Sequence, residues 1–145
     1  MLTIITIGKV KDKNCLQLIE MYKQRIKLFT KIKTIEIKDE KDKQKETQNV
    51  LKHLNNGFII VLDEHGKLMS SYELSNCIKD KINNSVEIIF IIGNYYGIDE
   101  RVKQKAQLIL SLSKMTFPHE IAQLILTEQI YRAFTILKGL PYHKD

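Results

Sequence analysis

Hydrophobic positions follow two different spacings along this chain, and together they predict strands separated by helices. Four nearly unbroken apolar stretches are rich in β-branched residues, as expected of strands buried on both faces: Leu2–Val10, Phe58–Leu62, Val86–Ile92 and Leu108–Leu112. A fifth stretch, Ile32–Lys38, alternates with a period of two, which also indicates a strand.

The segments between these strands have helical spacing. Helices are predicted over residues 14–29, 70–82 and 98–105, and from Pro118 for about twenty residues to just before Gly139. Ser70 and Glu73 have the spacing of a capping box. The charged stretch 39–55 is interpreted either as a weakly anchored helix or as partly a mobile loop.

The resulting order, strand and helix alternating five times, predicts an α/β fold. Strands buried on both faces and separated by helices form a mostly parallel sheet flanked by helices on both faces. With 145 residues, the chain is expected to form a single domain over residues 1–145. The last helix is apolar on most of its sides, so it needs two partners. We expect one to be the sheet and the other a second subunit; the alternative is a helix central to the monomer.

Composition excludes several classes of protein. Hydrophobic residues make up 43% and charged residues 28%, as in a soluble globular domain rather than a disordered or disulfide-rich one. No apolar run approaches the roughly 18 residues of a membrane span, and the N-terminus has no secretory signal pattern. Cys15 and Cys77 lack metal-ligand spacing. We therefore expect a cytoplasmic protein with reduced thiols, no metal site and no membrane association.

The net charge of +6 is unevenly distributed. Residues 1–52 contain 13 lysines and arginines against 7 acidic residues, whereas residues 53–145 contain 10 of each. This excess suggests that one flank faces a polyanion such as nucleic acid. A lysine-rich composition inherited from an AT-rich genome would produce the same bias without any function.

Candidate chemistry gathers where strands end, because ligands collect at the carboxyl edge of an open parallel sheet. Three such ends stand out: Leu62-Asp63, Gly93–Gly97 and Leu112–His119. Gly93 would let a ligand approach the backbone, and the last segment offers backbone polar groups beside apolar side chains, which suits a flat heteroaromatic such as adenine. The chain has no GxGxxG motif, P-loop or GxSxG elbow. The run Asp63-Glu64-His65 is interpreted as a polar turn rather than a metal cluster.

Three further stretches carry a family resemblance: residues 111–119 (SLSKMTFPH), 128–134 (EQIYRAF) and 141–144 (PYHK). They closely resemble the RlmH family of SPOUT-class methyltransferases, which act on pseudouridine in large-subunit (23S) ribosomal RNA. The resemblance implies a C-terminal trefoil knot that binds S-adenosylmethionine, methylation of pseudouridine N3 on the assembled ribosome, and a homodimer. In that homodimer the C-terminal tail of one subunit would complete the pocket of the other.

The resemblance also assigns residues. The implied cofactor positions fall in the three segments already selected: Leu62, Gly93, Leu112, Ser113, Lys114, Met115, Thr116 and Phe117. In the tail, His143 is the candidate for proton removal or substrate orientation, and Tyr142 for stacking on the base. Arg132 either binds a phosphate or the cofactor carboxylate, or forms a helix salt bridge with Glu128. Without the resemblance, this tail would be interpreted as a frayed terminus.

Two positions depart from the family pattern. Asn94 stands where the family has the second glycine of a pair, and Asn tolerates positive φ better than most residues. Gln123 stands where the family has arginine, and Lys114 or Arg132 could compensate. Two other functions therefore stay open: a methyltransferase of the same class acting on transfer RNA, and a non-enzymatic RNA- or ribosome-binding module that has lost the cofactor.

Overall fold

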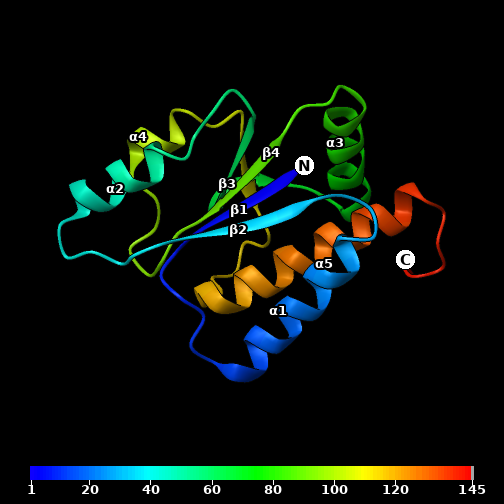
Figure 1. Cartoon of the computed structure of the whole chain (residues 1–145), viewed down its shortest axis with the longest axis horizontal. Coiled ribbons are helices and arrows are strands. Elements are labelled where there is room, and N and C mark those ends of the chain that lie inside the picture. The colour runs from blue at the N-terminus through cyan, green and yellow to red at the C-terminus, as the bar shows by residue number, and fades with distance from the viewer. Residues whose placement is uncertain (145) are drawn as a thin grey trace.

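The computed structural model describes residues 1–144, in which five strands pair into one parallel sheet (Figure 1). The strand order is β2-β1-β4-β3-β5. The strands are β1 (Leu2–Ile7), β2 (Ile32–Ile37), β3 (Phe58–Leu68), β4 (Ile88–Ile92) and β5 (Leu108–Ser111). The helices are α1 (Lys13–Ile26), α2 (Lys43–Leu51), α3 (Ser71–Asn83), α4 (Glu100–Lys103) and α5 (His119–Leu137).

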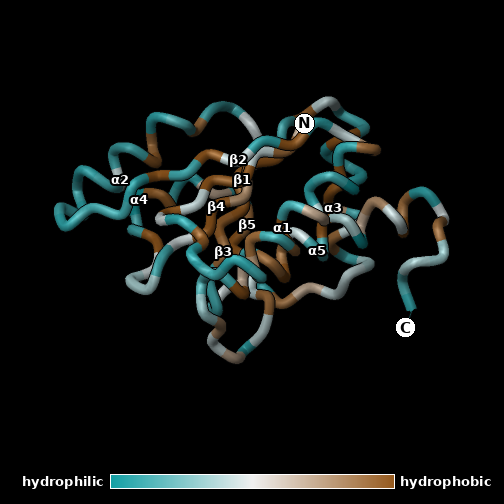
Figure 2. The backbone as a smooth tube through the Cα atoms, turned by 60° about the horizontal axis from the view of Figure 1, so that its bottom comes forward, coloured by the Kyte–Doolittle hydropathy of each residue, from teal (hydrophilic) through white to brown (hydrophobic). Residues whose placement is uncertain are grey.

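Helices cover both faces of the sheet, which confirms the predicted α/β architecture. One core cluster includes Leu2 and Ile4 of β1 and packs against α1, α3 and α5; the other includes Ile5 and Ile7 and packs against α2 and α4. The hydrophobic segments gather in the central strands, and α2 is mostly hydrophilic at the outside (Figure 2). In the part of the chain described, no helix is both long and apolar enough to cross a membrane.

Side-chain caps fix where the helices begin. The Asp12 carboxylate accepts a hydrogen bond from the backbone N–H of Cys15 and so caps α1 at 2.9 Å. The predicted capping box of α3 is confirmed: Ser70 Oγ accepts from the N–H of Glu73, whose carboxylate accepts from the N–H of Ser70. Cys15 is buried, Cys77 is half-buried, and both are free thiols.

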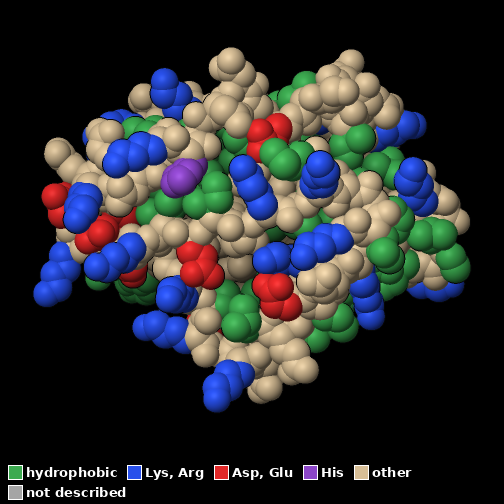
Figure 3. Space-filling model, in the orientation of Figure 1, with side chains coloured by type: hydrophobic (Ala, Val, Ile, Leu, Met, Phe, Trp, Pro, Cys, Tyr) green, Lys and Arg blue, Asp and Glu red, His purple; other side chains and the backbone are tan. Residues whose placement is uncertain are grey.

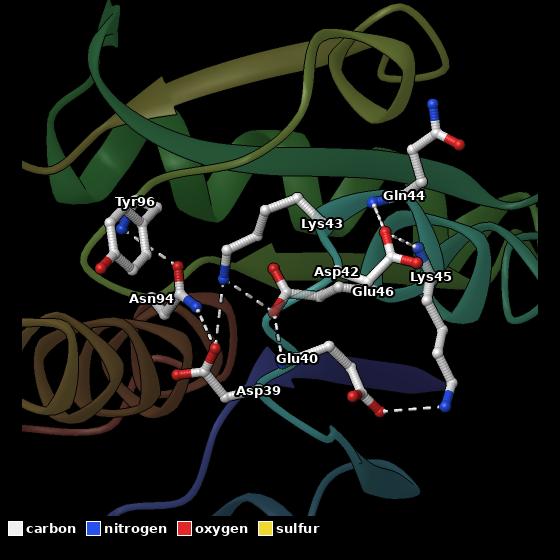
Figure 4. Close-up of polar contacts among 9 residues, drawn as sticks. All are labelled: Asp39, Glu40, Asp42, Lys43, Gln44, Lys45, Glu46, Asn94 and Tyr96. Carbon is white, nitrogen blue, oxygen red and sulfur yellow. Dashed lines mark hydrogen bonds and ion pairs between the residues drawn. The ribbon is translucent and has the colours of Figure 1, made fainter.

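The charged stretch 39–55 contains a well-anchored helix, α2. Thr47 and Val50 are buried against the sheet, and Val50 belongs to the second core cluster. Glu46 is also buried: its carboxylate accepts from the backbone N–H of Glu40 at 2.9 Å and pairs with Lys43 at 3.2 Å (Figure 4). The helix is thus fixed by a buried carboxylate as well as by apolar packing.

Strand β3 is longer than its apolar run predicted. The expected turn at residues 63–66 is a bulge within the strand, because Lys67 and Leu68 pair again with Leu110 and Ser111 of β5 after a register shift. Gly66 is required there, since a Cβ would lie 2.6 Å from the carbonyl oxygen of Ile109. Pairing with a distant strand overrides the turn-like sequence.

Helix α5 lies on the sheet between α1 and α3, so its partners belong to the same chain. Leu126, Ile130 and Phe134 are buried there. The expectation that its burial requires a second subunit is wrong, and the alternative of a central helix holds. An apolar stripe at its N-terminal half is nevertheless left open to solvent, where Ile121 is 41% exposed.

Candidate functional site

The bulge of β3 and the carboxyl ends of β4 and β5 enclose a cleft of about 860 Å³, within the range of small-molecule sites. The three segments selected from the sequence all border it. Seven of the eight expected cofactor positions line the cleft: Leu62, Gly93, Leu112, Ser113, Met115, Thr116 and Phe117. Lys114 lies in the same loop and is not among the lining residues. Within the described chain, no cluster of His, Cys, Asp or Glu could hold a metal ion.

The loop between β5 and α5 is held in shape by its own hydroxyl groups. Ser113 Oγ accepts from the N–H of Met115 at 3.0 Å, and Ser111 Oγ lies within 3.0 Å of the carbonyl oxygens of Ser113 and Glu64. Thr116 Oγ1 donates to the Glu64 carboxylate. The bulge of β3 and the loop after β5 are thus joined across the cleft, with the carboxylate of Glu64 at its wall.

An ion pair between Asp63 and Lys103 closes another side of the cleft. Burial alone would raise the pKa of Asp63, but the Lys103 ammonium and the backbone N–H of His65, 2.8 Å away, outweigh burial. The pKa of Asp63 is therefore held below its ordinary value, and the carboxylate is ionised at neutral pH.

Replacing Lys103 by methionine should lower the free energy of unfolding by about 1–2 kcal/mol at pH 7, because Asp63 would keep a half-buried charge without its partner. Since the folded-state pKa is lowered, this stabilisation is present above about pH 4 and is lost as the pH falls through the folded value. Urea unfolding at several pH values measures the difference. Lys105→Met, which removes an exposed lysine, is the control; an equal loss in both variants, or a loss that persists in acid, would contradict the assignment.

The loop from Gly93 to Gly97 is a tight turn tied to its surroundings by Asn94. The N–H of Gly97 donates to the Asn94 carbonyl oxygen at 2.9 Å, and the N–H of Tyr96 donates to Asn94 Oδ1 at 3.1 Å. Asn94 Nδ2 donates to Asp39 at 3.0 Å (Figure 4). Asn94 does not have a positive φ; Gly97 supplies it, at +79°. The asparagine therefore acts through its side chain and not through the conformation expected of it.

Gly93 is needed for the turn that borders the cleft. A Cβ at this position would lie 2.9 Å from the carbonyl carbon and oxygen of Gly97. The absent side chain therefore makes room for the turn itself, which in turn shapes the cleft. Gln123, the other departure from the family pattern, is only 7% exposed on α5 and does not line the cleft, so it is not placed to contact RNA from the surface.

The expected catalytic residues form a second cluster at the opposite end of α5. Arg132 donates to Glu128 Oε1 from Nη2 at 2.7 Å and from Nε at 3.0 Å, so the salt bridge considered for it is present. Arg132 Nη1 lies 3.0 Å from His143 Nδ1, and the Tyr142 hydroxyl donates to the same Glu128 oxygen at 3.0 Å. At about 1.5 Å of rise per residue, Arg132 is roughly 20 Å along α5 from His119 at the cleft.

The contacts of this cluster define its protonation states. Burial, hydrogen bonding with Tyr22 and the neighbouring Glu128 raise the pKa of Tyr142 far above its ordinary value, so its hydroxyl stays protonated. Because arginine can only donate, His143 Nδ1 accepts in this contact, which places a ring proton on Nε2. Glu128 holds the cluster together by accepting hydrogen bonds from Arg132 and Tyr142. From the sequence alone, we expected Glu128 only as a salt-bridge partner of Arg132. Its i,i+4 spacing to Arg132 was the available signal.

Sequence comparisons place this chain among RNA-modifying enzymes. A family model described as "Predicted SPOUT methyltransferase" matches residues 1–143. The chain is 43% identical to the ribosomal RNA large subunit methyltransferase H of Caldicellulosiruptor bescii, covering 99% of this chain and 100% of that protein. It is 40% identical to the protein of the same name from Clostridium botulinum, with 99% of each chain covered.

Solved structures show the same fold at low sequence identity. A probable methylase family protein from Haemophilus influenzae superimposes with a TM-score of 0.60 at 11% identity, covering 99% of this chain and 70% of that one. The methyltransferase AviRb from Streptomyces viridochromogenes, in complex with AdoMet, gives a TM-score of 0.50 at 9% identity. The superposition with AviRb covers 90% of this chain and 56% of AviRb.

Proposed function

Because this chain belongs to the SPOUT methyltransferase family, we propose that it is an S-adenosylmethionine-dependent methyltransferase of large-subunit ribosomal RNA, as its relatives are named. The observation that carries the proposal is the cleft in which the ends of β3, β4 and β5 meet. At a finer level, the acceptor is N3 of a pseudouridine, and the chain after β4 is threaded into a trefoil knot.

The residues around the cleft fit the methyl donor. Leu62, Ile92 and Phe117 supply apolar walls for an adenine ring, and the loop after β5 supplies backbone polar groups to bind its edge. The donor is cationic at its sulfonium, and the cleft offers the Glu64 carboxylate, whose described partners are the Thr116 hydroxyl and the His65 ring. Shape and charge thus both match the donor.

The reaction is a direct displacement, so the protein has to align two reactants and favour loss of a proton from N3. When bound, S-adenosylmethionine supplies an electrophilic methyl group on sulfur. Arg132 and the Nε2–H of His143 are suited to stabilise the negative charge on an imide base whose N3 proton has passed to solvent water. Tyr142, whose hydroxyl is held protonated on Glu128, keeps its proposed role of stacking on the acceptor base.

We further propose that the site is shared between two subunits. The cleft and the tail cluster lie at opposite ends of α5 in one chain, so the tail cannot reach its own cleft without leaving Arg132 and Glu128 (Figure 1). A homodimer would bring the tail of one subunit to the cleft of the other. The half-exposed apolar stripe of α5, which includes Ile121, is the surface available for that contact. Acting on ribosomes, the protein would work in the cytoplasm.

The function is tested by incubating the protein with S-adenosylmethionine carrying a labelled methyl group and, separately, assembled ribosomes, free large subunits and bulk transfer RNA. Label is expected in large-subunit RNA, and mass spectrometry of nuclease fragments should locate it on a pseudouridine. Label in transfer RNA alone would overturn the proposed substrate. No label in any RNA, together with no heat on titration with the donor, would favour the non-enzymatic RNA-binding module.

A further inference from the structure

Two tyrosines stand exposed at the mouth of the cleft. Tyr95 is 90% and Tyr96 is 75% exposed, and both line the cleft. Their ring centroids are 5.5 Å apart with an interplanar angle of 87°. Neither ring belongs to a core cluster, so packing within the chain does not account for two large aromatic side chains at this place.

The turn that carries these rings is fixed. Asn94 ties it to Asp39 and caps the N–H of Tyr96, and the ammonium of Lys43 lies 4.6 Å from the centroid of the Tyr96 ring (Figure 4). A cation over one face of Tyr96 leaves the other face for a different partner. The rings therefore form a preorganised platform against the ammonium of Lys43, which also pairs with Asp39 and Glu46.

The strand order places exposed lysines next to this platform. From the cleft outward, β4 is followed by β1 and then β2, so the loops after β1 and β2 lie at the same carboxyl edge. They carry four exposed lysines for which the described chain shows no ion pair: Lys9, Lys11, Lys38 and Lys41. Of the acidic residues in these loops, Asp39 pairs with Lys43 and Glu40 with Lys45. Asp12 and Asp42 cap α1 and α2 through their carboxylates. Figure 3 shows both basic and acidic side chains on the surface over the α2 end of the molecule.

We propose that Tyr95 and Tyr96 stack on unpaired bases of the RNA substrate while the lysines after β1 and β2 contact its phosphates. The RNA strand then runs along the carboxyl edge of the sheet, from the lysines after β1 and β2, across the two tyrosines, to the acceptor base in the cleft. Aromatic rings beside a basic groove are the usual means of holding single-stranded RNA. The inference rests on the proposed function, to which it adds the RNA-contacting surface.

The platform is tested with a fluorescent single-stranded oligoribonucleotide of mixed sequence and, in parallel, with large subunits in the methylation assay. The double variant Tyr95→Ala/Tyr96→Ala should raise the Kd for the oligonucleotide, and the KM for large subunits, about 30-fold or more, the effect of two lost base stacks. An equal rise in its Kd for S-adenosylmethionine would overturn the proposal, because both rings also line the donor cleft. Tyr95→Phe/Tyr96→Phe should restore binding, because stacking needs only the ring faces.

The lysines have a separate signature. Lys38→Ala/Lys41→Ala should make the slope of log Kd against log salt shallower by about 1.4, whereas the tyrosine variant should leave the slope unchanged. Leu28→Ala removes another exposed apolar side chain, 82% exposed at the far edge of the sheet, and should affect neither quantity. An unchanged Kd in the tyrosine variant would overturn the proposal. Conversion of the protein to a monomer in that variant would also overturn it, because the rings would then belong to a subunit interface.

These results separate the two proposals. If wild-type protein methylates ribosomal RNA but the tyrosine variant binds RNA normally, the platform is wrong and the proposed function stands. If the variants behave as expected toward the oligonucleotide but no ribosomal RNA is methylated, the RNA surface stands and the proposed function fails.

Discussion

Replacing Gly93 by valine is expected to raise the Kd for S-adenosylmethionine more than about 100-fold, a loss of about 2.8 kcal/mol. A Cβ at residue 93 would lie 2.9 Å from the carbonyl group of Gly97, so the turn between them has to open. That turn borders the cleft together with the loop after β5. Calorimetric titration measures the affinity, and the far-ultraviolet circular dichroism spectrum should show that the fold persists.

Gly57→Val is the matched control for this variant. A Cβ at Gly57 would be equally crowded, 2.8 Å from the carbonyl oxygen of Glu87, but this glycine precedes β3 at the opposite edge of the sheet. Both variants should lower the melting temperature, and only Gly93→Val should lose the methyl donor. Normal binding by Gly93→Val, or an equal loss in Gly57→Val, would show that the cleft has been assigned wrongly.

The second large effect is expected from mixed dimers. His143→Ala should bind S-adenosylmethionine normally and lose at least about 100-fold in turnover, as when one preorganised hydrogen-bond donor is removed. Co-expression of His143→Ala with Gly93→Val should restore activity to about a quarter of the wild-type value, since half of the dimers are mixed and each of these has one intact site. The intact site combines the cleft of the His143→Ala subunit with the tail of the Gly93→Val subunit.

The control for the mixed dimers is a pair of variants defective in the same element. His143→Ala with Arg132→Ala leaves every tail damaged and should restore nothing, because both residues lie in the same cluster. Mixed dimers of His143→Ala with Gly93→Val can be isolated by placing a different affinity tag on each subunit. If these isolated dimers are inactive, the tail acts within its own subunit or outside the site.

The sequence predicted the sheet and the place of the cleft because both follow from local patterns. Apolar runs locate the strands, and the rule that ligands bind at carboxyl ends brings together segments as distant as Leu62 and Phe117. The bulge at residues 63–66 was missed because its cause is non-local: Lys67 pairs with Leu110 of β5. A turn-like sequence gives no sign of a distant strand that continues the ladder.

The details of the site were hidden for the same reason. Asn94 acts through Asp39, 55 positions earlier, and Gly93 makes room for the Gly97 backbone. The tail cluster depends on contacts between α5 and residues after it, such as the Tyr142 hydroxyl on Glu128. Residue types and spacing indicate which groups could act, whereas tertiary contacts determine their protonation and reach.

The central claim is that loops at the ends of β3, β4 and β5 form the binding site of the methyl donor. A crystal structure of the protein grown with S-adenosylhomocysteine, the demethylated product, tests it most directly. We expect density for the adenosine between Gly93 and the loop from Leu112 to Phe117, with the C-terminal tail of a second subunit beside its sulfur atom. Density for this compound at any other place on the molecule would contradict the account.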